Sequence, residues 1–174
     1  MNPTPLAFGL RLLVLFAVLA GGFEASRGTA FERWLVEDAI LAPTVAIIDA
    51  VTPAEHAVLL GRTITAPGGP GLHVTRGCEG IELFLMLAAA IAAFPARLER
   101  RLQGLAIGAL LAYGLSVLRL MALYYTLRHS PAAWEALHGL VLPLGPVALM
   151  ALYFLRWSSA KSQLQAAQPA ARAA

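Results

Sequence analysis

The sequence predicts an all-α polytopic membrane protein with four transmembrane helices and an outer-face segment that contains a short helix and a β-hairpin. Hydrophobic residues make up 59% of the chain and charged residues only 13%, whereas a soluble domain has about 25% charged residues. The mean hydropathy is +0.69. Four apolar segments approach the roughly 20 residues that cross a bilayer, and arginines cluster in the short loops beside them.

The predicted spans divide the chain into four regions. The spans cover residues 5–23, 78–94, 103–125 and 138–157. The regions are a first transmembrane helix at 1–23, an outer segment at 24–77, a three-helix membrane core at 78–157 and a disordered, Ala/Gln-rich tail at 158–174. Pro143 and Pro146 predict an irregular first turn of the fourth span. An alternative for the first span is a cleaved signal peptide with residues 12–20 as its apolar centre.

Positively charged residues predict the direction of the spans. They lie between the second and third spans and after the fourth, as Arg97, Arg100, Arg101, Arg156, Lys161 and Arg172. Short loops rich in Lys and Arg stay in the cytoplasm, so both termini are predicted inside and residues 24–77 outside. The arginines form no continuous basic face, which argues against nucleic acid as a partner despite the net charge of +3.

The outer segment is predicted to contain three elements. Residues 24–38 are polar and resemble an interfacial helix, and residues 41–51 are too short to span, which favours a shallow or re-entrant element. Residues 57–65 and 72–76 flank a Pro-Gly-Gly-Pro-Gly turn and predict a two-stranded hairpin. The hairpin leads directly into Cys78.

Cys78 is the only cysteine, so it is an inert buried residue, an intermolecular partner or a reactive thiol. Gly77 and Gly80 bracket it where an extended segment is predicted to turn into a helix, which is an exposed setting. A helix N-terminus stabilises a thiolate and can bind a developing oxyanion. The alternative is a small apolar residue at the boundary of a span.

Arg119 is predicted to lie at the same depth as Cys78, because about 24 Å of helical rise separates it from the inner end of its span. An arginine at membrane depth is functional by default, although an interfacial arginine that snorkels outward is the alternative. Small residues recur every fourth position before it and predict a face for close helix packing, at Gly104, Gly108, Ala112 and Ser116.

His138 opens the fourth span, again level with Cys78. A thiolate nucleophile, a histidine acid and base, and a fixed cation suit acyl transfer through a thioester. His129 is the competing base. Glu82 is expected one turn below Cys78 on the same helical face, either supporting the site or only neutralising Arg119, and Trp134 is expected at the interface or against the substrate.

Three motifs in order resemble the exosortase/archaeosortase family. They are Gly77-Cys78-Glu79-Gly80-Ile81-Glu82 running into a helix that ends at Phe94-Pro95, Ser116-Val117-Leu118-Arg119-Leu120, and His138 at the last span. The match covers roughly residues 72–157, and the hairpin and short length are similar to small exosortases such as the exosortase H subtype. Ser116 departs from the asparagine expected in many members.

The resemblance implies a cysteine transpeptidase of the bacterial inner membrane with Cys78, Arg119 and His138 as its catalytic residues, facing outward, without metal or cofactor. Its substrates would be secreted proteins with a PEP-CTERM-like signal, comprising a short motif, a transmembrane helix and a basic cluster. One alternative is a non-catalytic membrane assembly factor for protein export or exopolysaccharide systems. Another, a metal or redox module, is disfavoured because no two candidate ligands are closely spaced.

Overall fold

A computed structural model describes the chain from Thr4 to Ala171, with the side chains of Thr4 and of residues 6–159. The fold is mostly helical. Three of the described helices are long and apolar enough to cross a membrane, at Leu6–Ala25, Leu98–His129 and Pro131–Ser159. Their length and composition indicate a membrane protein with the lipid bilayer as its solvent.

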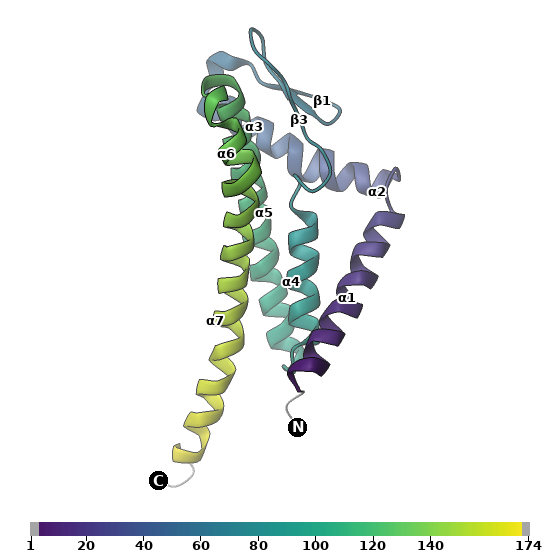
Figure 1. Ribbon diagram of the computed structural model, residues 1–174, viewed down its shortest axis with the longest axis vertical. Helices are drawn as coiled ribbons and strands as arrows, with labels where there is room; N and C mark the ends of the chain where they lie inside the picture. The colour runs from purple at the N-terminus through teal and green to yellow at the C-terminus, as the bar shows by residue number, and fades with distance from the viewer. Residues whose placement is uncertain (1–3, 172–174) are drawn as a thin grey trace.

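Four helices lie alongside one another in Figure 1, namely α1 (Pro5–Ala25), α4 (Ile81–Ala93), α5 (Leu98–His129) and α7 (Leu142–Ala171). Across one end of this bundle run α2 (Ala30–Arg33), the π-helical segment η1 (Trp34–Leu41) and α3 (Ala42–Val51). A small sheet covers the same end, which is called the sheet end below. The predicted interfacial helix therefore continues to Val51, and the apolar run at 41–51 lies across the bundle instead of spanning it.

The second predicted span is shorter than expected. Helix α4 has 13 residues, about 20 Å of rise, which is less than the ~30 Å hydrocarbon core. It begins only after Gly80, whose φ of +78° is left-handed, and it ends before Phe94, whose extended backbone (φ −76°, ψ 136°) precedes a proline. Four full spans are therefore not confirmed: α4 is a short apolar helix packed against α1, α5 and α7.

The predicted small-residue face of α5 packs as expected. Gly104, Gly108, Ala112 and Ser116 are all buried. A Cβ at Gly104 would lie 2.6 Å from Trp157 Nε1, and one at Gly108 would overlap Leu87 Cδ2. Because no side chains intervene at these glycines, α4 and α7 approach the backbone of α5 closely.

Two π-helical segments each precede a proline. η1 ends just before Pro43, and η4 (Leu137–Val141) ends just before Pro143. Proline lacks the N–H that an α-helix needs and crowds the carbonyl four residues earlier, so the preceding turn widens. This is the irregular start that the prolines predict for the last span. At its other end α7 continues to Ala171, through most of the tail predicted to be disordered, consistent with the high helix propensity of Ala and Gln.

The sheet has three antiparallel strands in place of the predicted two-stranded hairpin. They are β1 (Val58–Leu60), β2 (Thr63–Thr65) and β3 (Leu72–His73), in that order. Leu60 pairs with Thr63, and Ile64 pairs with Leu72. The first predicted strand is divided by a turn at Gly61, whose φ of +58° fits the glycine-first hairpin turns.

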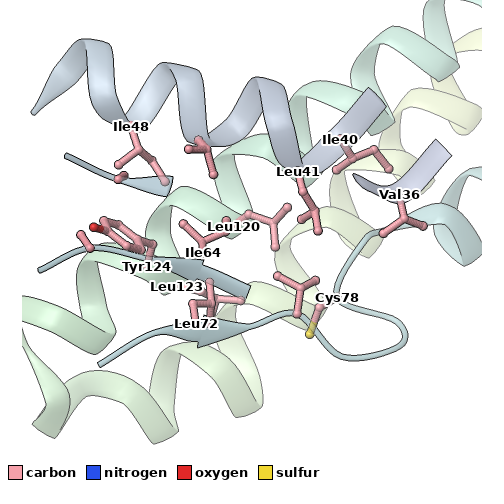
Figure 2. Packing of buried hydrophobic residues seen from close by; sticks show 14 of the residues in the cluster. Val36, Ile40, Leu41, Ile48, Ile64, Leu72, Cys78, Leu120, Leu123 and Tyr124 are labelled. Atoms are coloured by element: carbon pink, nitrogen blue, oxygen red, sulfur yellow. The ribbon is translucent and has the colours of Figure 1, made fainter. Parts of the chain in front are cut away.

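The sheet, α3 and the sheet end of α5 share one apolar core, shown in Figure 2. Ile48, Ile64 and Leu120 are each fully buried. Cys78 lies at the border of this core. The loop that carries the thiol is therefore packed against three elements and does not hang free at the end of a helix.

Candidate functional site

The Cys78 loop is a tight turn between β3 and α4. Gly77 and Gly80 both have a φ of +78°, a left-handed conformation that suits glycine. The Cys78 N–H donates to Thr75 O at 3.1 Å, and the Thr75 hydroxyl lies 3.6 Å from Cys78 Sγ. The prediction that Cys78 is exposed is wrong, because the residue is only 8% exposed. Strand β3 and helix α5 pack over it.

Arg119 contacts this loop directly. Its Nη1 donates to Gly77 O at 3.1 Å, and its Nη2 lies 4.0 Å from Cys78 Sγ. The ion pairs formed by the described residues do not include Arg119, and its Nε has no hydrogen-bond partner among them. Its positive charge is therefore directed at the thiol and its loop rather than neutralised by a carboxylate.

His138 lines the same cavity as Cys78. The cavity has a volume of 150 Å³ and is also lined by Thr75, Leu120 and Trp134. The Trp134 and His138 rings are stacked, with centroids 5.0 Å apart and planes 6° from parallel. His138 Nδ1 is buried and has no partner among the described groups. The imidazole is thus held by stacking while a ring nitrogen stays unengaged.

His129, the competing base, is engaged elsewhere. Its Nε2 lies 2.9 Å from Glu55 Oε1, and its ring stacks on Tyr125 at 6.1 Å. It is not among the residues that line the Cys78 cavity. This geometry favours His138 over His129 as the partner of the thiol.

Glu82 does not share a helical face with Cys78, because Cys78 precedes the helix. Its carboxylate accepts from Arg27 Nη2 at 3.4 Å, so it neither orients His138 nor pairs with Arg119. Glu82 and Arg119 nevertheless line one cavity of 370 Å³ between α1, α4, α5 and α7. Ser116 borders this cavity too, donating to Ala112 O at 2.8 Å.

A buried ion-pair cluster that the sequence does not predict lies behind the Cys78 loop. Arg62 Nη2 donates to Glu79 Oε1 at 2.6 Å, and Arg62 Nη1 donates to Glu32 Oε1 at 2.9 Å. The Glu79 side chain is 1% exposed. The only signal in the sequence is an acidic residue directly after the cysteine in an apolar setting, which does not identify its partner.

A second missed cluster fastens the sheet to α5. Glu55 accepts from the Tyr124 hydroxyl and forms an ion pair with Arg128 at 3.1 Å. Arg128 also donates to Ala66 O at 3.2 Å and to Pro67 O at 3.1 Å in the β2–β3 loop. The Tyr124 bond lowers the pKa of Glu55, with smaller contributions from His129 and Arg128. This cluster positions the strand that leads into Cys78.

The described residues contain no group of three or more His, Cys, Asp or Glu side chains with the spacing of a metal site. The donor set beside Cys78 is one thiol, one imidazole and one guanidinium, and a guanidinium does not ligate metals. The arrangement fits proton transfer and anion stabilisation better than coordination.

Fold and site together define a helical membrane protein in which a thiol, a guanidinium and an imidazole meet at one end of the bundle. Comparison with protein-family models, curated proteins and solved structures finds no match for this chain. The resemblance to the exosortases thus stays a prediction from the motifs, and function is argued from the site.

Proposed function

We propose that the chain is an exosortase-like cysteine transpeptidase or peptidase that cleaves secreted proteins at a C-terminal sorting signal. One observation carries the proposal: Arg119 contacts both Gly77 and Cys78 Sγ, while His138 lines the cavity that holds the thiol. A nucleophile, a cation and an acid–base group at one point are the parts that acyl transfer needs.

The reaction begins when His138 takes the proton of the Cys78 thiol. The thiolate attacks the carbonyl carbon of the scissile peptide, and a C–S bond forms while the carbonyl electrons move onto oxygen. Arg119 and the first-turn amides of α4 stabilise this oxyanion. The C–N bond then breaks as His138 protonates the leaving amine. Water or an acceptor amine attacks the thioester, releasing the acyl group and returning the thiol.

Trp134 and the two glycines have positioning roles in this proposal. The stacked indole fixes the plane of the imidazole without using either ring nitrogen. The left-handed glycines allow the loop to turn Cys78 toward Arg119. Such orientation of the reacting groups lowers the entropic part of the barrier.

The proposed setting is the outer face of a bacterial inner membrane. The cytoplasmic side is assigned from Arg97, Arg100 and Arg101 at the start of α5 and from Arg156 in α7. The start of α5 lies at the end of the bundle away from the sheet (Figure 1). The sheet end and Cys78 then face outward, where secreted substrates emerge. The partly apolar cavity beside Arg119 gives room for the substrate chain between its motif and its membrane anchor.

Co-expression with a tagged substrate that ends in a motif, an apolar helix and an arginine cluster tests the proposal. Wild-type protein is expected to shorten the substrate, and Cys78→Ala, Arg119→Gln and His138→Gln are expected to leave it intact. His129→Gln is the matched control and is expected to retain processing. Normal processing by Cys78→Ala would instead favour the non-catalytic assembly factor, in which the same residues only pack or pair.

A further inference from the structure

A larger cavity lies between α1, η1, α4 and α5, and Cys78 is not among its lining residues. Its volume is 540 Å³, and its walls are almost entirely apolar, with Phe23, Leu35, Phe84 and Ala109 among the residues that form them. Cavities of about 300–1,000 Å³ with apolar walls and a few placed polar groups are typical ligand sites. The polar group that decides the ligand here is Glu79.

Glu79 lines this cavity with a buried and incompletely bonded carboxylate. Its side chain is 1% exposed, and Oε1 accepts from Arg62 at 2.6 Å. Oε2 is buried and has no hydrogen-bond partner among the described residues. A buried carboxylate oxygen without a donor is costly, so the cavity is complementary to a ligand that brings an N–H or O–H group to Oε2.

The charge around Glu79 selects a cationic donor. Arg62 is shared between Glu79 and Glu32, whose side chains are 1% and 7% exposed. Two carboxylates around one guanidinium leave one negative charge in excess. The next arginine, Arg27, forms its ion pairs with Glu24 and Glu82 and interacts with Glu79 only at longer range. A ligand whose donor group carries a positive charge and whose chains are apolar therefore complements Glu79 and the cavity walls best.

We propose that this cavity binds a lipid with a primary ammonium group, whose N–H donates to Glu79 Oε2 and whose aliphatic chain lies along the apolar wall. Glu79 and Ser26 line the cavity near the sheet end. Ala109 lines it farther from the sheet end, two helical turns before Ser116 along the spanning helix α5. The head group would thus lie near the end of the bundle and the chain at membrane depth. The bilayer supplies such amphiphiles, and the site is independent of the proposed peptidase activity.

Lipid selectivity of the wild-type protein gives the first test. Delipidated protein in detergent is mixed with phosphatidylethanolamine, phosphatidylcholine or phosphatidylglycerol of identical acyl chains, and bound lipid is counted by native mass spectrometry. The ethanolamine lipid is expected to bind about tenfold to a hundredfold more tightly, because only it brings charged N–H donors to the carboxylate. Equal binding of all three lipids would overturn the proposal.

Variants give the second test. Glu79→Gln keeps the shape but removes the charge, and it is expected to abolish the preference for the ethanolamine lipid. Ala109→Leu fills the cavity while leaving the Arg62–Glu79 pair intact, and it is expected to lower binding at least tenfold. Ala106→Leu, at an exposed position on the same helix, is the matched control and is expected to bind as wild type. Unchanged selectivity in Glu79→Gln, or equal binding by the two leucine variants, would refute the site.

Discussion

Gly80 joins the Cys78 loop to α4, and two features require glycine there. Its φ is +78°, in the left-handed region that costs an L-residue roughly 1–2 kcal/mol. A Cβ would also overlap Ser116 Oγ and lie 3.3 Å from Ser116 Cβ. Gly77 has the same φ of +78°, but no atom lies within 4 Å of its Cβ position. Gly77→Ala therefore isolates the backbone strain.

The two alanine variants should differ by the contact with Ser116. We expect Gly77→Ala to lower the free energy of unfolding by about 1–2 kcal/mol and Gly80→Ala by about 2–4 kcal/mol. In Gly80→Ala the Ser116 hydroxyl must turn away from Ala112 O, to which it donates at 2.8 Å, and such a bond contributes about 1 kcal/mol. Ser116→Ala removes the overlapping oxygen, so it should recover most of this difference in the double variant.

The assay is unfolding by sodium dodecyl sulfate in mild detergent micelles, followed by tryptophan fluorescence. Four proteins complete a double-mutant cycle: wild type, Gly80→Ala, Ser116→Ala and the double variant. The expected coupling energy is about 1–2 kcal/mol, with the double variant more stable than the sum of the single changes. Equal losses in Gly77→Ala and Gly80→Ala, or strictly additive changes, would refute the close packing of the loop on α5.

Three further changes test the surroundings of the site. The hydrogen bond from Tyr124 holds the pKa of Glu55 below its usual 4.5, so the carboxylate's stabilising contribution is present above that value and is lost as the pH falls through the lower folded pKa. Thermal melts from pH 7 to about pH 3 should therefore show a shallower acid loss in Glu55→Gln, and an unchanged slope would contradict this. Arg62→Met leaves two buried carboxylates without their cation and should cost about 3–5 kcal/mol in chemical unfolding, while exposed Arg33→Met should cost almost nothing; similar losses would argue against the cluster. Trp134→Leu should lower kcat with little change in KM, because the imidazole loses its stacking partner, and Trp134→Phe should keep most of the rate; a change confined to KM would assign the indole to substrate binding instead.

The sequence predicts much of the membrane architecture because apolar length and small-residue spacing are local patterns. The face that begins at Gly104 is readable from its four-residue period, since helical geometry alone places those positions in one row. The shared depth of Cys78 and Arg119 follows from counting helical rise. Both inferences need only helical geometry and the thickness of the bilayer.

The features in which the structure differs from the sequence prediction depend on backbone conformation or on contacts between residues that are far apart in the sequence. The sequence predicts a helix that begins at Cys78, but the left-handed Gly80 delays its start. Helix α4 is therefore shorter than predicted, and Glu82 pairs with Arg27. The turn at Gly61 divides a segment that composition presents as one strand. The Arg62–Glu79 pair joins the sheet to the thiol loop, and a tertiary contact of this kind has no periodic signature in the sequence.

Cys78 is the proposed nucleophile, and the most direct test is to isolate its thioester. Membranes that contain the protein and a tagged substrate are quenched in acid, and the peptide that contains the only cysteine of the chain is analysed by mass spectrometry. The prediction is an adduct with the mass of the substrate's acyl fragment on Cys78, released by hydroxylamine and absent from Cys78→Ala. Substrate cleavage that proceeds without this adduct, and equally in Cys78→Ala, would contradict the assignment.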